Sequence, residues 1–421
     1  MRKILLSIIE WWLSLLARSK IKKANPKIIA ITGSFGKTST KEAIYFVLSK
    51  KFGSDCGKNW GNMNSVVGLP LAILGLRNYS FGPGFSLDLF RALWGYFFYR
   101  LPKILVLELG IDKPGEMDKL LKIIQPDIGV LTGISETHLE ELRDIEGVKR
   151  EKSLMVSAIK AGGFFIVNGN DKNCLEIRPG KDVETVKYGQ NFDVSYSDLE
   201  ISISGNNFNI RANKEIRPVK SKLVGEHSLN ILLSATAVCL KIGLKLPEIV
   251  ESLEQIQPQK GRMNLIKLKN QMILVDDSYN SNPKSAVEAL KTISAIDWDG
   301  RRVAILGNMN ELGEYTKEGH LKVGEEAGKT VDLLLVVGPN VGNFLKGAKK
   351  SGMSEDNIFC YPNPEKLIAD LDEKLKPKDL ILVKASQNKM RFERVAEHLI
   401  GDMEVSRNIL VRQEKKWQKI V

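Results

Sequence analysis

A glycine-containing loop between a short apolar strand and a helix constrains this chain more than any other feature. The pattern predicts a strand at Lys27–Ile31 and a helix at Lys37–Ser49, and the loop that joins them reads Thr-Gly-Ser-Phe-Gly. Glycines let backbone N–H groups approach a phosphate, and the N-terminus of a helix favours its negative charge. We therefore predict a nucleotide-binding phosphate loop here, in preference to a simple glycine turn.

The residues of this loop have separate expected roles. Lys37 would meet the terminal phosphates of ATP and take part in their transfer, and Thr38 would bind Mg²⁺. Ile31 stands where the commonest phosphate-loop motif has its first glycine, so the loop is shorter than usual. The expected ATP-binding residues here are Gly33, Ser34, Gly36, Lys37, Thr38 and Ser39.

The length of 421 residues exceeds what one hydrophobic core usually organises, so we expect more than one domain. Strand and helix patterns alternate over 27–257, which predicts a central ATP-binding α/β domain with a mainly parallel sheet. The alternation begins again near Met272 and predicts a C-terminal Rossmann-like α/β domain over 258–421. Further strands are expected at 104–107, 128–131, 164–167, 273–275, 303–306, 333–337 and 380–383, with a small antiparallel piece within 183–212.

Charge and cysteine content narrow the range of partners. The formal net charge of +12 could reflect binding to nucleic acid, to an anionic membrane or to anionic substrates. The basic residues are spread along the chain and form no nucleic-acid reading motif, so we expect no nucleic-acid partner. The four cysteines lack the spacing of a metal site or a disulfide framework, which favours a reducing cytoplasm. We expect a cytoplasmic monomer.

Residues 1–26 form an amphipathic N-terminal segment, apolar over Met1–Ala17 and basic beyond. The apolar run is shorter than the roughly 20 residues that span a bilayer, and it lacks a small-residue cleavage site for secretion. One interpretation is a helix in the interface at the inner membrane face, with Trp11 and Trp12 at headgroup depth and lysines facing anionic lipid. The other is a helix packed on the body of the protein.

Three more residues could carry chemistry. Glu108 ends an apolar strand, at the edge of a sheet where ligands of α/β folds bind. His138 is one of only four histidines, and Lys152 lies in the next predicted helix. Each is a weak signal alone, because a strand-end glutamate is often solvated and a lysine beside Lys149 and Arg150 is often a surface residue.

In order along the chain, these features resemble the Mur ligases of peptidoglycan synthesis. The family's phosphate loop is matched by Thr32–Thr38, and its acidic strand and His-Leu elements by Glu108 and His138. Gly61–Ser65, Asp276–Pro283 and Arg302–Gly313 resemble further elements of the branch that adds D-alanyl-D-alanine to a muramoyl-tripeptide. The resemblance covers roughly residues 27–400 and joins many motifs in one order.

The resemblance implies an ATP-dependent amide ligase and roles for several residues. Such ligases transfer the γ-phosphate of ATP to a substrate carboxylate, and an amine then attacks the acyl phosphate; positioned cations are the main requirement. Thr38 and Glu108 would hold one Mg²⁺, and His138 would help to hold a second. Lys152 matches a lysine that is carbamylated and then offers oxygen ligands to magnesium. Lys37, His138 and Lys152 are thus the expected catalytic residues.

The C-terminal domain would also contact the nucleotide. Arg262, Asp277, Tyr279 and Asn280 match residues that do so in the family, and closure of the two domains would exclude water from the acyl phosphate. Residues expected to bind the substrate are Asn62, Asn64 and Lys384.

The chain also departs from the family pattern. Relatives begin with a domain of about 80 residues that binds the UDP part of the substrate, a size typical of a small domain. Here about 26 residues precede the first strand, so we expect that domain to be missing. An extra apolar stretch at Phe81–Arg100 would be a membrane-docking surface, a substitute platform or internal packing.

Three functions therefore stay open at this point. The first is ligation of D-alanyl-D-alanine to a muramyl-peptide precursor, with a lipid-linked form replacing the UDP form as a further hypothesis. The second is a ligase of the same fold for another amino acid or polymer. The third is a non-catalytic nucleotide-binding scaffold at the membrane, which would not need the metal-ligand set of Thr38, Glu108, His138 and Lys152.

Overall fold

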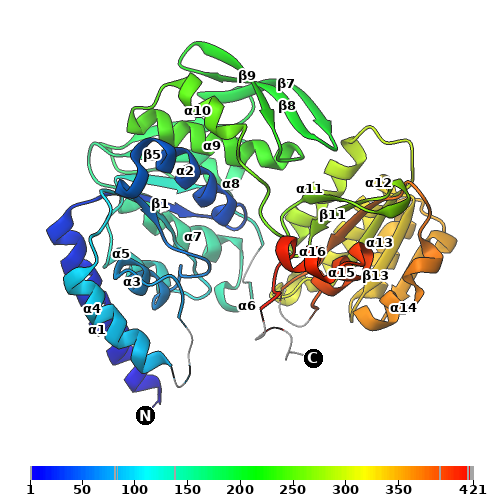
Figure 1. The fold of residues 1–421 in the computed structure, drawn as a ribbon, viewed down its shortest axis with the longest axis horizontal. Helices are drawn as coiled ribbons and strands as arrows, with labels where there is room; N and C mark the ends of the chain where they lie inside the picture. Colours follow the sequence, from blue (N-terminus) through cyan, green and yellow to red (C-terminus); the bar gives the residue numbers. More distant parts are fainter. Residues whose placement is uncertain are drawn as a thin grey trace. The chain divides into compact units, whose positions relative to one another are not determined.

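The structure is a computed structural model that describes residues 2–79, 82, 84–136, 139–387, 390–414 and 417. The chain forms two compact units, which are described separately below (Figure 1). The first unit comprises Met1–Ser197, Asn209–Val219 and Leu229–Glu254. The second comprises Asp198–Phe208, Lys220–Ser228 and Gln255–Val421.

A largely parallel sheet organises the first unit. The strands lie in the order β2-β3-β1-β4-β5-β6-β7-β8-β9, and β2 through β6 pair in parallel. The order places β1 between β3 and β4, so the loop after β1 lies beside the ends of both neighbours. The bounds are β1 Lys27–Thr32, β2 Cys56–Lys58, β3 Ile104–Glu108, β4 Ile128–Leu131, β5 Phe164–Asn168, β6 Glu184–Tyr188, β7 Val194–Ser202, β8 Gly205–Ala212 and β9 Glu215–Ser221.

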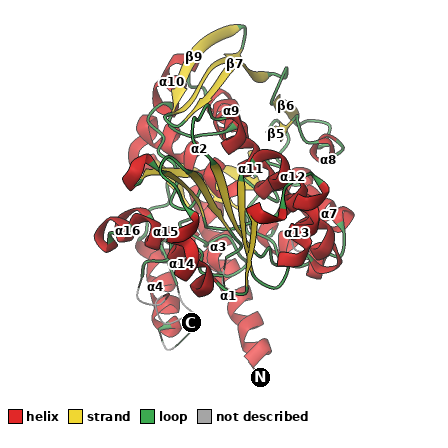
Figure 2. Ribbon diagram, turned by 90° about the vertical axis from the view of Figure 1, so that its right-hand side faces the viewer, coloured by secondary structure: helices red, strands yellow, loops and turns green. Residues whose placement is uncertain are grey.

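The last three strands differ from the parallel part of the sheet, and their residues Asp198–Phe208 and 220–221 are counted in the second unit. Only two residues separate β7 from β8 and β8 from β9, and such short links join antiparallel neighbours. This agrees with the antiparallel piece expected from the alternating sequence. Figure 2 shows β7 and β9 beside α10 (Leu246–Leu253).

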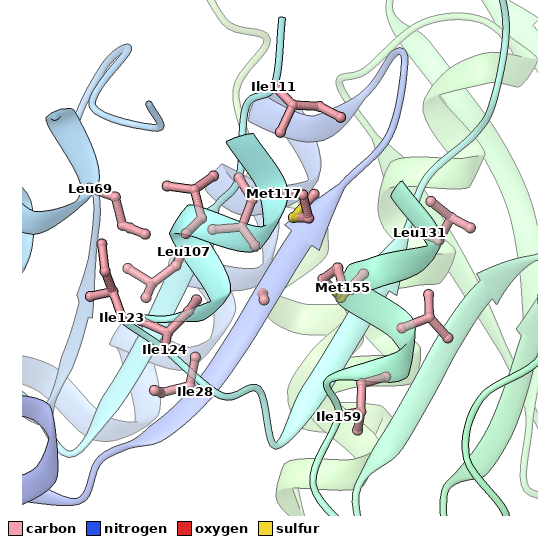
Figure 3. Packing of buried hydrophobic residues seen from close by; sticks show 14 of the residues in the cluster. Ile28, Leu69, Leu107, Ile111, Met117, Ile123, Ile124, Leu131, Met155 and Ile159 are labelled. Carbon is pink, nitrogen blue, oxygen red and sulfur yellow. The ribbon is translucent and has the colours of Figure 1, made fainter. Parts of the chain in front are cut away.

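The helices of the first unit cover the parallel strands because β1, β3 and β4 are apolar on both faces. Figure 3 shows Ile28 of β1, Leu107 of β3, Met117 of α5 and Met155 of α7 in one buried cluster. The bounds are α1 Arg2–Ala24, α2 Lys37–Phe52, α3 Gly68–Ile73, α4 Phe85–Phe98, α5 Glu116–Leu121, α6 Leu139–Leu142, α7 Ile145–Ser157, α8 Lys172–Leu175 and α9 Glu226–Ile242.

The second unit contains a smaller sheet with the order β10-β11-β15-β12-β13-β14. The edge strand β10 runs antiparallel to β11, and the other pairs are parallel. The strands are β10 Asn264–Lys267, β11 Ile273–Asp277, β12 Arg302–Gly307, β13 Leu333–Val337, β14 Ile358–Tyr361 and β15 Leu380–Lys384. The helices are α11 Pro283–Ala295, α12 Thr316–Thr330, α13 Val341–Lys350, α14 Pro364–Lys374, α15 Glu393–Ile400 and α16 Met403–Ile409.

The predicted α/β fold class is therefore confirmed in both units. Cys56, Cys174, Cys239 and Cys360 are free thiols. Within the part of the chain that the structure describes, no helix combines the length and apolar character needed to cross a membrane.

Candidate active site

The predicted phosphate loop lies between β1 and the N-terminus of α2. Gly33 has φ +154°, and a Cβ there would lie 2.1 Å from Oγ1 of Thr132, so no larger residue fits. Gly36 has φ +74°, a left-handed conformation that favours glycine, and no side chain caps the helix that follows. The loop thus presents an uncapped helix N-terminus, which favours a bound phosphate.

Hydrogen bonds to the segment after β4 hold this loop in place. The backbone N–H of Ser34 donates to the carbonyl oxygen of Gly133 at 2.7 Å. The hydroxyl of Ser34 donates to the carbonyl oxygen of Ser135 and accepts from the backbone N–H of Ser135. The hydroxyl of Thr132 donates to the carbonyl oxygen of Phe35 at 2.5 Å. Lys37 Nζ donates to the carbonyl oxygen of Gly33 at 2.7 Å, so the lysine folds back over the loop.

The sheet register brings Glu108 to this loop. Ile31 of β1 pairs with Glu108 at the end of β3, directly before the loop begins. The hydroxyl of Thr38 donates to Oε1 of Glu108 at 3.2 Å, and Nδ2 of Asn64 donates to the same oxygen at 2.9 Å. Three residues predicted from different motifs therefore meet, whereas Asn62 lies exposed in the loop that carries Asn64.

The sequence did not single out Asn59, which fixes the backbone of Glu108. This buried side chain donates to the carbonyl oxygens of Glu108 and Met63 and accepts from the N–H of Glu108, all at 2.9 Å. A lone asparagine before a glycine turn carries no sequence signal for such a role. Asn59 positions the carboxylate by holding the end of β3.

The second oxygen of the same carboxylate has one ion-pair partner and is otherwise open to a ligand. Oε2 of Glu108 is buried and receives no hydrogen bond from the described residues, although Lys41 Nζ lies 3.4 Å away. Lys41 is fully buried and also lies 3.5 Å from Glu42. Its four-residue spacing from Lys37 puts both lysines on one face of α2, a signal that could have revealed it.

These residues suit a magnesium ion. A buried carboxylate oxygen without a hydrogen bond and a neighbouring threonine hydroxyl are the hard oxygen ligands that Mg²⁺ prefers. Among the residues that the structure describes, no group of three or more His, Cys, Asp or Glu side chains is placed to bind a metal ion by itself. A magnesium ion here would therefore take further ligands from phosphate and water.

Lys152 is buried in α7, not on the helix surface. Burial is the main reason why the pKa of Lys152 lies well below its usual range, and the positive charge of Lys37 lowers it further. A neutral amine is the form that reacts with CO₂, so the environment suits the expected carbamylation. The other expected ligand, His138, lies outside the described residues.

The second unit also places a carboxylate at the end of a buried strand, but here the paired lysine also donates a hydrogen bond. Asp277 ends β11 and is in register with Lys384 of β15. Lys384 Nζ donates to Oδ2 of Asp277 at 2.6 Å and to the carbonyl oxygen of Asn280 at 3.0 Å, while the N–H of Met263 donates to Oδ1 at 3.3 Å. Burial lowers the pKa of Lys384, and Asp277 opposes this shift.

Tyr279 and Asn280 follow β11 in the same cluster. The guanidinium of Arg262 lies 4.2 Å from the ring centroid of Tyr279, and Arg412 donates to the carbonyl oxygen of Tyr279 at 2.5 Å. Oδ1 of Asn280 accepts from the N–H of Gln387 at 3.3 Å. Arg262, Asp277, Tyr279, Asn280 and Lys384 therefore gather at one end of this sheet.

Two further titratable groups lie in this region. Burial raises the pKa of Asp276 to about 6, and its Oδ1 accepts from the N–H of Ser278 at 3.1 Å. Burial also lowers the pKa of His227, which lies 3.4 Å from the hydroxyl of Thr292. His227 would therefore be neutral at pH 7.

Comparison with known proteins gives this arrangement a family. Residues 31–239 match the Mur ligase middle domain, and residues 261–387 match the Mur ligase glutamate ligase domain. Together these matches span most of the chain. The chain belongs to the Mur ligase family.

Individual relatives agree with this membership. A UDP-N-acetylmuramoyl-tripeptide–D-alanyl-D-alanine ligase of Bacillus subtilis is 27% identical over 388 residues, which are 91% of this chain and 78% of the relative. The MurF crystal structure from Acinetobacter baumannii has a TM-score of 0.80 and 26% identity, covering 93% of this chain and 81% of the other. MurF ligase from Thermotoga maritima in complex with ADP has a TM-score of 0.77 and 26% identity, with coverages of 94% and 84%.

Proposed function

We propose that this Mur ligase family member is an ATP-dependent ligase that joins a carboxylate of a muramyl-peptide precursor to D-alanyl-D-alanine. The observation that carries the proposal is the Glu108 carboxylate, which lies beside Thr38 of the phosphate loop and has one buried oxygen that faces Lys41 but receives no hydrogen bond from the described residues. The names of its relatives, and the ADP complex of one of them, support the substrate and the nucleotide.

The proposed reaction has two steps. A carboxylate oxygen of the precursor attacks the γ-phosphorus of ATP, and ADP leaves. The amine of D-alanyl-D-alanine then attacks the carbonyl carbon of the acyl phosphate, and inorganic phosphate leaves with one of the original carboxylate oxygens. The amine loses a proton as the amide bond forms.

The residues of the phosphate loop bind and orient the nucleotide in this proposal. The N–H groups at the start of α2, including those of Thr38 and Ser39, would hold the phosphates together with Gly33, Ser34 and Gly36. Lys37 Nζ would exchange its bond to the loop carbonyl for the terminal phosphate.

Thr38 and Glu108 would hold one Mg²⁺ in this proposal, and His138 would help to hold a second. Bound Mg²⁺ would neutralise the charge that develops on the phosphate oxygens. Asn59 and Asn64 keep the carboxylate of Glu108 in position for this task.

Lys152 would act as a carbamate. Its neutral Nζ would attack the carbon of CO₂ and release one proton, and the new carbamate oxygens would complete the magnesium site. Growth of a ¹³C resonance in protein exposed to ¹³C-bicarbonate, absent from Lys152→Met, would support this step. An unmodified Lys152 in an enzyme at full activity would contradict it.

In the C-terminal domain, Arg262, Asp277, Tyr279 and Asn280 are proposed to contact the nucleotide. Asn62, Asn64 and Lys384 are proposed to contact the peptide substrates. The protein would act as a monomer in the cytoplasm, in peripheral contact with the inner face of the membrane.

The test is release of phosphate from ATP and Mg²⁺ with muramyl-tripeptide precursors, with and without UDP, and mass spectrometry of the product. We expect release that depends on D-alanyl-D-alanine and a precursor lengthened by that dipeptide. Lengthening by a different amine would make the protein a ligase for another substrate. ATP binding without turnover on any amine would instead indicate a nucleotide-binding scaffold.

A further inference from the structure

Helix α1 carries apolar residues on two opposite faces. Ile9, Leu13 and Leu16 follow a helical stripe toward the protein, where Leu13 is completely buried and packs with Leu71 and Ala92. This inner stripe accounts for the attachment of α1 to the first unit. A surface helix needs only one such stripe, so the second stripe calls for a separate explanation.

The outer stripe of α1 is exposed and changes from apolar to basic along the helix. Ile4, Ile8, Trp11 and Leu15 recur at spacings of three and four, and each is at least 45% exposed. Ile4, Ile8 and Trp11 line a shallow hollow with Ser7. The same spacing then reaches Arg18 and Lys22, which are also exposed.

Helix α4 presents a comparable stripe of larger side chains. Leu87, Phe90, Trp94, Phe97 and Phe98 are each at least 51% exposed. The opposite side of α4 is buried through Asp88, Ala92 and Gly95, so this helix is attached by one face only. Two exposed arginines, Arg91 and Arg100, accompany the aromatic stripe.

Polar contacts fix the two helices to each other. Lys20 Nζ of α1 donates to the carbonyl oxygens of Gly95 and Tyr96 of α4, at 2.8 and 2.9 Å. The hydroxyl of Ser19 lies 3.0 Å from that of Tyr96, and Lys23 Nζ donates to the same hydroxyl at 2.8 Å. Figure 1 shows α1 and α4 together at one edge of the first unit.

Close packing also holds α4 against the first unit. A Cβ at Gly95 would lie 1.9 Å from the carbonyl oxygen of Leu74, so α4 approaches α3 as closely as backbones can. The two exposed stripes therefore belong to a fixed pair of helices. We call them together the α1–α4 outer surface.

We propose that the α1–α4 outer surface binds the surface of a lipid bilayer with anionic headgroups. Large exposed apolar side chains in this number, on two helices that are bonded to each other, are uncommon on a soluble protein and mark a binding site. Tryptophan and phenylalanine enter the boundary between headgroups and acyl chains, while arginine and lysine remain with the headgroups. The succession of Trp11, Leu15, Arg18 and Lys22 along one face of α1 matches this layered environment.

The positive charge of this surface favours a bilayer over a second copy of the chain as its partner. A symmetric dimer through this surface would bring two copies of the same positive charge, from Arg18 and Lys22 of α1 and from Arg91 and Arg100 near α4, into one interface. Six basic residues and only one acidic residue, Glu10, occur in α1. Anionic headgroups complement this charge, whereas a second copy repeats it.

This inference specifies the membrane contact named under the proposed function, but it does not depend on the ligase reaction. Loss of ligation would leave vesicle binding intact, and failure to bind vesicles would leave ligation of a soluble precursor intact. The two proposals therefore fail separately.

The experiment is flotation of the full chain with phosphatidylcholine vesicles that contain or lack phosphatidylglycerol. We expect the wild type to float with the anionic vesicles and much less with the neutral ones. The Trp94→Ser/Phe97→Ser variant should lower the partition coefficient by about tenfold for each side chain removed. Arg18→Gln/Lys22→Gln should lower it by about fivefold for each cation, on anionic vesicles only.

A matched control removes exposed apolar residues elsewhere. Ile216 and Met403 are 54% and 61% exposed outside α1 and α4, so Ile216→Ser/Met403→Ser should float as the wild type does. Thermal melting should be unchanged in all variants because the replaced side chains are exposed. Wild type that floats with neither vesicle would overturn the proposal, as would a Trp94→Ser/Phe97→Ser variant that floats normally. A dimer in light scattering that this variant abolishes, without vesicle binding, would assign the surface to a second copy.

Discussion

The carboxylates at the ends of β3 and β11 are both buried but differ in the partners that their oxygens have. Each strand is buried in a largely parallel sheet and ends in a carboxylate. Asp277 of β11 has a complete set of partners, with Lys384 Nζ on one oxygen and the N–H of Met263 on the other. Glu108 of β3 has donors on Oε1 only, and its Oε2 receives no hydrogen bond from the described residues.

This difference distinguishes a site that is complete in the protein from one that requires a ligand. Oε2 of Glu108 has an ion-pair partner in Lys41 but no hydrogen bond, and a buried charged oxygen without a hydrogen bond is incompletely satisfied. The open oxygen of Glu108 lies beside the phosphate loop, where a nucleotide would bring a cation. We therefore propose that the β3 end serves catalysis, and that the pair at the β11 end stabilises the fold in addition to its proposed ligand contacts. Four substitutions test that assignment.

The largest effect is expected on the β1–β3 side. Lys37→Met removes the cation that reaches the terminal phosphate, and cations in that role are worth about 10³–10⁵-fold in phosphoryl transfer. We expect kcat for ADP release to fall within this range while the melting temperature stays unchanged. Lys50→Met, at an exposed position of the same helix, is the matched control and should keep full activity. Equal losses in both variants would break the assignment.

The second-largest effect is expected in the free energy of unfolding, for a substitution at the end of β11. Lys384→Met leaves Asp277 as a buried carboxylate without its cation, which costs about 3–5 kcal/mol in the free energy of unfolding. The double variant Asp277→Asn/Lys384→Met should recover part of this loss because no charge remains buried. Denaturant unfolding measures both. A single variant as stable as the wild type would show that the pair contributes nothing to the fold.

Asp276, the neighbour of Asp277, should give this unit a pH dependence. Burial raises the pKa of Asp276 from 3.8 to about 6, so between these values the folded chain binds a proton that the unfolded chain has released. The free energy of unfolding should therefore fall as pH rises through this window, by about 3 kcal/mol in all. Asp276→Asn keeps the acceptor for Ser278 and should remove this slope in urea unfolding. A slope that survives in the variant would have to come from other groups.

The smallest of the four effects concerns the metal. Glu108→Gln keeps the acceptor oxygen for Thr38 and Asn64 but removes the charge, so the Mg²⁺ concentration for half-maximal activity should rise by about 10–100-fold. Glu42→Gln, which alters the other carboxylate near Lys41, is the control and should change it little. An unchanged magnesium requirement in Glu108→Gln would show that the open oxygen has another purpose.

The sequence predicted the strands well because they are continuous apolar runs bounded by turns. The strands at Ile128–Leu131 and Leu333–Val337 have the expected bounds, and Ile104–Glu108 is one residue longer than expected. The meeting of Thr38 and Glu108 was expected from the resemblance to the Mur ligases, and the structure shows it because β1 and β3 are parallel neighbours.

Other features depend on tertiary contacts that have no local signature. Asn59 binds the backbone of Glu108 across 49 positions, and nothing near Asn59 in the sequence indicates this. Arg412 reaches Tyr279 across 133 positions for the same reason. For α1, the interpretation of a helix packed on the protein is confirmed for the face that carries Leu13, whereas the membrane-interface interpretation stays a prediction for the face that carries the exposed Trp11.

Transfer of a carboxylate oxygen to phosphate would show whether this chain activates a carboxylate as an acyl phosphate. The muramyl-peptide precursor would carry ¹⁸O in its reacting carboxylate, and the phosphate released in the presence of ATP, Mg²⁺ and D-alanyl-D-alanine would be analysed by mass spectrometry. We predict one ¹⁸O atom in each phosphate formed, because the amine displaces phosphate together with a carboxylate oxygen. Phosphate free of ¹⁸O, released while the amide product forms, would contradict the account.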